Sequence, residues 1–334
     1  MEFNTKLTKE LCELYGPTGR EQKVAAYIQD QICGHVDEMW VDCLGNLIAH
    51  KKGPGKKVVL SAHMDQLGLM IKTIDEKGFG RIGALGSIKP YNLIDSRIQM
   101  ESGVQGVLIC EKKEDMGKIT HHDLYIDFAM LSPEKVKEKV RVGEVAITRS
   151  EYYENEECVM MQCLDDRIGC MILIDSILRD VKNTNDMYYV FSVQEENGCF
   201  GAMTSTYALK PDLFITFDVA CTGDELRGIR TDIKLGAGAG IKAMDYFMIV
   251  NRYVVDTLVK IADSGAIKYQ IEVSENGGTD AHTAQLVRSG IKAGAITIPT
   301  RNIHSRDEII CKQDILECIR MAMALETVEL DGHF

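Results

Sequence analysis

Two patterns of hydrophobic residues alternate along the chain, one with the spacing of helices and one typical of strands. Apolar residues recur at helical spacing in segments 7–16 and 20–32, which a Gly-Pro break separates, so two helices are predicted at the start. Segment 47–65 then has the pattern of a hairpin, whose second arm is a buried strand through residues 58–60.

The pattern changes from about residue 68 to residue 157, where strands are short, glycines are frequent and one helical stretch appears around 132–140. This pattern of short strands and frequent glycines predicts a small β-rich barrel or sandwich. Beyond it, longer helices alternate with apolar strands, which favours a mixed, largely parallel sheet flanked by helices. We therefore predict an α/β fold with a discontinuous main domain, residues 1–67 and 158–334, and an inserted barrel-like domain, residues 68–157.

Composition narrows the class of protein. The 334 residues are 45% hydrophobic and 26% charged, as in ordinary soluble globular proteins, and neither a membrane-spanning run nor a secretory signal pattern is visible. Eleven cysteines are scattered without a C-x-x-C pair, which argues against a disulfide framework or thiolate zinc site and favours a reducing, cytoplasmic location. A net charge of −12 without a basic face argues against nucleic acid as a partner.

Acidic and imidazole side chains gather where open α/β sheets place their sites, at the carboxyl ends of predicted strands and in one adjoining loop. Each has a structural explanation when taken alone: an Asp pair before a helix, for example, can cap it. Their joint occurrence is explained best by a metal centre with oxygen and nitrogen ligands. The set is His63, Asp65, Asp165, Asp166, Glu195, Glu196, Asp218 and His304.

Six sequence blocks follow one another along the chain, and all but GGTDAH contain residues of this set: SAHMDQLGLM, LDDRIGC, VQEENGCFGA, TFDVACTGD, GGTDAH and IPTRNIHSRDE. They resemble the signature blocks of the glutamyl and deblocking aminopeptidases, the TET-type metallo-aminopeptidases of the two-metal zinc-peptidase clan. The resemblance covers essentially the whole chain. It implies a zinc-peptidase-like fold and a hydrolase that removes N-terminal residues from small peptides with a free N-terminus.

The resemblance also implies two divalent metal ions per subunit. His63 and Asp218 would bind one ion, Glu196 and His304 the other, and Asp165 would bridge the two. Zinc and cobalt suit such ligands best, and manganese is a further candidate.

Three neighbouring residues receive supporting roles from the same resemblance. Glu195 would be the general base that takes a proton from the attacking water. Asp65 would hold the outer N–H of the nearby imidazole and so fix its tautomer. A cis peptide bond is expected between the bridging Asp and Asp166.

Other functions share this ligand set. A related two-metal carboxypeptidase or acyl-amino-acid deacylase stays open, whereas a glycanase is a weak alternative because glycosidases usually rely on two carboxylates without a metal. A non-catalytic metal scaffold is disfavoured, since it needs the ligand Glu196 but not its neighbour Glu195. The resemblance further implies a homo-oligomer, which is either a dimer formed through domain 68–157 or a dodecamer built from such dimers.

Two remaining features are interpreted structurally. His282 falls inside a predicted helix that begins near Thr279 or Asp280, and it is not expected to bind a metal. Segment 241–255, rich in methionine and aromatic residues, is predicted to pack in the core or at a subunit contact.

Overall fold

A computed structural model describes residues 1–112, 116–226 and 229–334, and its main body is a mixed sheet of eleven strands. The central strands β12, β3, β13 and β16 run parallel to one another. In sheet order the strands are β1 (Glu38–Val41), β2 (Leu47–Lys51), β12 (Asp186–Ser192), β3 (Lys57–His63), β13 (Leu213–Cys221), β16 (Lys292–Arg301), β17 (Glu308–Cys311), β11 (Cys158–Met161) and β10 (Tyr153–Glu154), with β14 (Ala239–Met244) beside β16 and β15 (Tyr269–Val273) beside β14.

Helices flank this sheet. α4 (Leu164–Leu178) contacts β3 and β13 and is buried from Leu164 to Ile177, as expected for a helix that is apolar all round. Around it lie α1 (Thr5–Glu13), α2 (Gln22–Ile32) and α8 (Lys312–Thr327). The remaining helices are α5 (Phe200–Leu209) and α7 (Asp280–Ala284), which pack on each other and on the same central strands, and α6 (Arg252–Ser264), which contacts β14 and α8.

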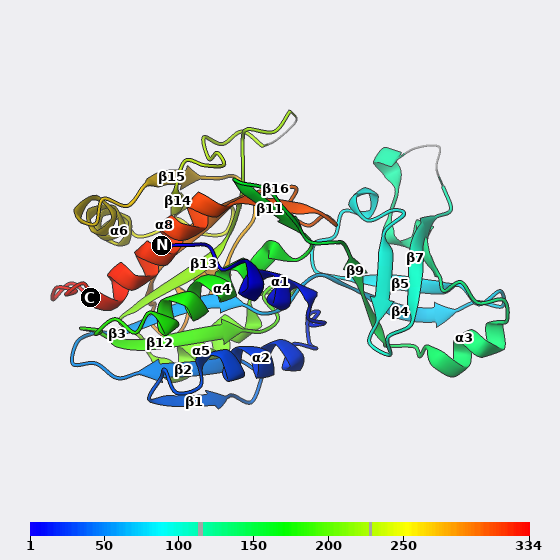
Figure 1. The fold of residues 1–334 in the computed structure, drawn as a ribbon, viewed down its shortest axis with the longest axis horizontal. Helices are drawn as coiled ribbons and strands as arrows, with labels where there is room; N and C mark the ends of the chain where they lie inside the picture. The colour runs from blue at the N-terminus through cyan, green and yellow to red at the C-terminus, as the bar shows by residue number, and fades with distance from the viewer. Residues whose placement is uncertain (113–115, 227–228) are drawn as a thin grey trace.

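A closed barrel forms a second lobe, drawn to the right in Figure 1. It has its own hydrophobic core, distinct from that of the sheet, and β7 alternates between buried and less buried positions as a barrel strand should. In barrel order the strands are β4 (Gly68–Ile74), β5 (Gly80–Leu85), β8 (Leu124–Asp127), β7 (Gln105–Cys110), β6 (Arg97–Met100) and β9 (Val145–Arg149). Its helical segments are η1 (Pro90–Asn92), η2 (Met116–Lys118), η3 (His121–Asp123) and α3 (Pro133–Lys139).

The predicted fold class is confirmed, but the predicted hairpin over residues 47–65 is wrong. Strand β12 lies between β2 and β3, antiparallel to the first and parallel to the second. The connecting loop crosses the start of β12 so closely that a Cβ on Gly53 would lie 2.0 Å from the carbonyl oxygen of Asn185. A strand more than 120 residues away in sequence therefore separates the two arms.

Segment 241–255 is also only partly in the core. Met248 and Val250 are buried, but the side chains between and before them are open to solvent, with Tyr246 70% and Phe247 59% exposed. The prediction of core packing is therefore wrong for these two aromatic residues, and the alternative, a subunit contact, stays a prediction. Among the described residues, no helix has both the length and the apolar character needed to cross a membrane.

Candidate active site

The parallel strands bring the five predicted metal ligands to one edge of the sheet. His63 is the last residue of β3, and Asp218 lies near the end of the neighbouring β13. Glu196 follows β12, and His304 follows β16. Asp165 sits in the first turn of α4, where its backbone is not helical, so its side chain points at the sheet edge instead of capping the helix.

Asp165 lies between the two histidines. Its Oδ1 is 3.1 Å from His63 Nε2, and its Oδ2 is 3.1 Å from His304 Nε2. On the first side Asp218 Oδ1 is 3.9 Å from His63 Nε2, and on the second side Glu196 Oε2 is 3.5 Å from His304 Nε2. The chain thus forms two groups of three possible ligands that share one carboxylate, each with ligand atoms within 4.8 Å of one another.

Burial dominates the electrostatics of this cluster. It raises the pKa of Asp218 well above the usual range and that of Glu196 to about 7. Burial alone would lower the pKa of His63, but hydrogen bonds with Asp165 and Asp65 raise it overall. For Asp165, burial raises the pKa, yet contacts with His304 and His63 outweigh it and lower the pKa below its usual range.

These residues fit a pair of divalent cations. The donor atoms are imidazole nitrogens and carboxylate oxygens, which is the ligand chemistry of zinc, cobalt and manganese. Glu196 Oε1 is buried without a hydrogen-bond partner, as expected of an oxygen that serves a cation. Acidic groups also outnumber imidazoles in the cluster, so divalent cations would offset its negative charge.

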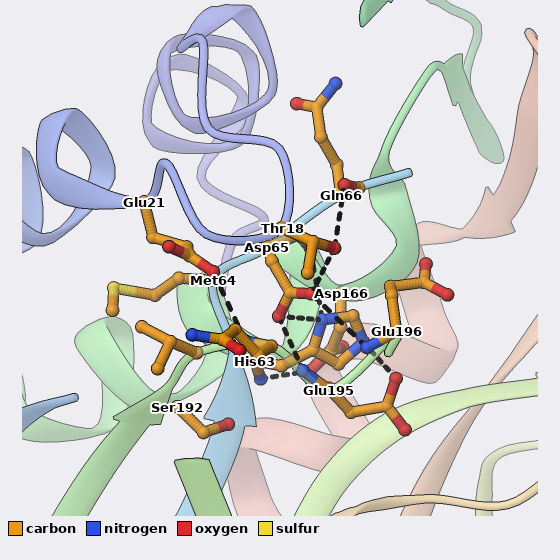
Figure 2. A network of polar contacts seen from close by, with 12 residues as sticks. Thr18, Glu21, His63, Met64, Asp65, Gln66, Asp166, Ser192, Glu195 and Glu196 are labelled. Atoms are coloured by element: carbon orange, nitrogen blue, oxygen red, sulfur yellow. Dashed lines mark hydrogen bonds and ion pairs between the residues drawn. The ribbon is translucent and has the colours of Figure 1, made fainter. Parts of the chain in front are cut away.

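Asp65 is fully buried and connects three parts of the site (Figure 2). Its carboxylate accepts hydrogen bonds from the backbone N–H groups of Glu195 and Glu196 at 3.0 and 3.2 Å, and from Thr18 Oγ1 at 2.8 Å. Asp65 Oδ1 also lies 3.5 Å from His63 Nδ1, while the Asp65 carbonyl oxygen accepts from that nitrogen at 3.1 Å. Asp65 therefore holds both the imidazole and the loop that carries the two glutamates.

Sequence reasoning missed several residues that hold the site. Glu308 accepts hydrogen bonds from the backbone N–H of Asp165 at 3.0 Å and of His304 at 2.9 Å. Glu21, in the N-terminal segment, accepts from the N–H of Gln194 at 3.2 Å. Both glutamates are buried, but only Glu308 stood close to a predicted ligand in the sequence.

The barrel lobe contributes to the site through the segment after β5. The Ser87 carbonyl oxygen accepts from His304 Nδ1 at 3.0 Å, which leaves Nε2 free to face Asp165. Asn92 donates to the His304 carbonyl oxygen at 3.3 Å, and Asn197, next to Glu196, accepts from the Gly86 N–H at 3.0 Å. The two lobes therefore meet at the second ligand group.

Two further expectations have clear outcomes. The peptide bond between Asp165 and Asp166 is cis, as predicted. His282 lies in α7 and is absent from both ligand groups. Its Nδ1 donates to the Thr279 carbonyl oxygen at 2.7 Å and lies 3.8 Å from the Cys199 sulfur.

Comparison with known proteins then identifies the family. The model of the M42 glutamyl aminopeptidases matches residues 45–321. This chain belongs to the M42 glutamyl aminopeptidase family. It is also 38% identical to a protein of Acetivibrio thermocellus described as a candidate aminopeptidase, over 94% of this chain and 96% of that one. With the lysyl aminopeptidase of Pyrococcus furiosus it shares 31% identity over 96% of each chain.

Solved structures agree with this M42 assignment. An aminopeptidase of Desulfurococcus kamchatkensis superposes with a TM-score of 0.92 at 32% identity, over 96% of this chain and 93% of that one. The TET1 peptidase of Pyrococcus horikoshii, which can assemble into a tetrahedron or a large octahedral shell, gives a TM-score of 0.86 at 27% identity, over 96% and 98% of the chains. The predicted family and the predicted enzyme class, a metal-dependent aminopeptidase, are confirmed.

Proposed function

We propose that this M42 protein removes the first residue of small peptides with a free N-terminus, using two divalent ions and Glu195. The observation that carries the proposal is the shared carboxylate of Asp165, whose two oxygens face His63 and His304 at 3.1 Å each. A single carboxylate placed between two ligand groups is the arrangement that a two-ion hydrolase needs.

The proposed ligands would divide between two ions. His63 and Asp218 would hold one, Glu196 and His304 the other, and Asp165 both. When bound, such a pair supplies Lewis-acid activation of a water molecule and of the peptide carbonyl. Zinc and cobalt are the first candidates, and manganese is the third.

Glu195 would move the proton. Its Oε2 lies 3.9 Å from His63 Nε2. It belongs to neither of the two groups that share Asp165, but to a separate group of possible ligands with Cys199 and Asp280. Burial raises the pKa of Glu195 well above the usual value, which favours accepting a proton from water and delivering it to the departing amine nitrogen. Asp65 positions this loop by accepting from the Glu195 N–H.

The cysteines and the structural relatives support proposals about where the enzyme is located and how it assembles. We propose a cytoplasmic location, supported by eleven cysteines that are all free thiols. We also propose a homo-oligomer in which the inserted domain, residues 68–157, forms the dimer and dimers build a dodecamer, as the shells of the Pyrococcus horikoshii relative suggest. Size-exclusion chromatography that gives a clean monomer would remove the assembly proposal.

A metal-replacement assay tests the reaction. The protein is stripped with a chelator, reloaded with Zn²⁺, Co²⁺ or Mn²⁺, and assayed on aminoacyl-p-nitroanilides with free or N-acetylated amines. We expect metal-dependent hydrolysis of the free-amine substrates alone. Glu195→Gln should lower kcat by about 10²–10⁴-fold with metal binding retained, whereas Glu156→Gln, at an exposed position, should leave kcat unchanged.

Each alternative predicts a different result in that assay. Hydrolysis confined to N-acetylated substrates would identify a deacylase. Release of the C-terminal residue from unblocked peptides would identify a carboxypeptidase. No hydrolysis with any of the three metals would refute the aminopeptidase.

A further inference from the structure

An exposed aromatic turn, residues 245–248, lies between β14 and α6 and is held rigidly from below. Asp245 Oδ1 accepts hydrogen bonds from the N–H groups of Phe247 at 2.9 Å and Met248 at 2.8 Å. The buried ammonium of Lys242 lies 3.3 Å from Asp245 Oδ2 and 2.8 Å from Glu272 Oε1. The turn therefore presents its aromatic rings to solvent from a fixed base.

Contacts lead from this turn to the proposed general base. The ring of Phe247 stacks on that of His282, with centroids 4.9 Å apart and planes at 24°. His282 Nδ1 lies 3.8 Å from the Cys199 sulfur, and this thiol donates to Glu195 Oε1 at 3.3 Å. The exposed face of Phe247 is thus two side chains away from the group that would handle the proton.

A glycine in the neighbouring backbone leaves room for the stacked rings of Phe247 and His282. Gly278 lies so close to the ring that a Cβ there would be 2.6 Å from Phe247 Cδ2 and 3.5 Å from His282 Nδ1. The second aromatic residue, Tyr246, meets Phe247 edge-on, with centroids 4.9 Å apart and planes at 86°. Two rings therefore form a shelf with exposed apolar surface, at a point where no side chain of residue 278 intrudes.

The charged groups beneath this shelf are paired with one another. The ammonium of Lys242 lies between the carboxylates of Asp245 and Glu272, so none of these three groups is free to neutralise a charged substrate side chain. An uncharged apolar chain, in contrast, would gain contact with the rings.

We propose that the shelf formed by Tyr246 and Phe247 receives the side chain of the substrate's N-terminal residue. The enzyme accordingly prefers large apolar and aromatic first residues to acidic or basic ones. The inference rests on the proposed function, because it assigns the shelf to the substrate of Glu195, from which it is separated by the side chains of His282 and Cys199. It makes Phe247 the specificity-determining residue of the shelf.

A comparison of kcat/KM across first residues tests the shelf. The metal-loaded enzyme is assayed on Phe, Leu, Ala, Glu and Lys p-nitroanilides, with Phe and Leu expected to be the best. Phe247→Ala should lower kcat/KM for Phe and Leu by about tenfold or more and leave the Ala substrate within about twofold. Compared with Phe247→Ala, Phe247→Leu should restore kcat/KM for the Leu substrate more than for the Phe substrate.

The control is Tyr153→Ala, which removes a comparably exposed ring, 55% against 59%, from the edge strand β10; it should change none of the five values. A preference for Glu or Lys in the wild type would overturn the inference and leave the proposed function standing. An equal loss on all five substrates, or a change of oligomeric state in Phe247→Ala without a change in substrate preference, would also overturn it. Absence of hydrolysis on every substrate would instead refute the proposed function.

Discussion

The ligand cluster at the ends of β3 and β13 and the Lys242 cluster between β14 and β15 both bury charged side chains, but they balance charge differently. Lys242 has two carboxylate partners, and one of them, Glu272, also accepts a hydrogen bond from Thr297 Oγ1 at 2.6 Å. In the ligand cluster the carboxylates of Asp165, Asp218 and Glu196 face the two imidazoles, and no lysine or arginine of the described residues pairs with them.

The difference separates a structural charge cluster from one built for a ligand. A buried ion group that serves the fold carries its counter-charge in the chain, because an unpaired buried charge is costly. A cluster with excess negative charge can be stable when cations complete it. The stability that the Lys242 cluster contributes should therefore be independent of metal ions, whereas the stability that the ligand cluster contributes should depend on them.

The largest expected effect on stability concerns Asp165, the proposed shared ligand. Chelation of the wild type should lower its free energy of unfolding, since each ion present at 1,000 times its Kd contributes about 4 kcal/mol. Asp165→Asn should abolish this metal-dependent stabilisation together with activity, as measured by denaturant unfolding with and without Zn²⁺. The exposed Asp30→Asn should keep the full metal effect, and retention of it by Asp165→Asn would contradict the shared-ligand assignment.

The next effect concerns the structural cluster. Lys242→Met leaves two buried carboxylates without their cation and should cost about 3–5 kcal/mol of unfolding free energy. The loss should be equal with and without added metal, which distinguishes it from the previous case. Lys260→Met, at an exposed position, is the matched control, and a loss that disappears on adding metal would show that the two clusters are not independent.

The smallest expected effect concerns Glu326, a buried carboxylate outside both clusters. Burial raises the pKa of Glu326 to about 6 from an ordinary value of 4.5, so between these values the folded state keeps a proton that the unfolded state has lost. Stability should therefore fall as pH rises through this window, by at most about 2 kcal/mol.

Glu326→Gln should remove this slope from unfolding curves measured between pH 4 and 7, because an amide does not titrate. The exposed Glu329→Gln should keep it. An unchanged slope in Glu326→Gln would show that another group is responsible.

Local pattern was sufficient to predict the fold class and the set of acidic and imidazole residues that meet at the sheet edge, whereas the five proposed ligands were selected from that set by the family resemblance. Parallel strands end at a common edge, so acidic and imidazole residues just after apolar strands, such as Glu196 after β12, could be placed together before any coordinates were known. The helix after Ser132 was similarly predicted from its own sequence, and Ser132 accepts a hydrogen bond from the N–H of Lys135 as its N-cap.

Features that depend on distant residues could not be predicted in this way. The hairpin prediction failed because nothing within 47–65 shows that β12 will pair between its arms. Glu21 supports the glutamate loop from a position 173 residues before its partner Gln194, and its sequence context is that of an ordinary helix start. The exposure of Phe247 depends likewise on the Lys242 cluster and on Gly278, neither of which marks the turn in the sequence.

The order in which the ligands occur along the chain also matters for synthesis. His63 is synthesised before most strands of the sheet, whereas His304 and its backbone partner Glu308 come after almost all of them. Because β16 inserts beside β13 and carries the chain to His304, a nascent chain that has not reached residue 304 cannot complete the second ligand group. A hydrolase that uses the proposed ligands would therefore stay inactive until synthesis has passed this residue.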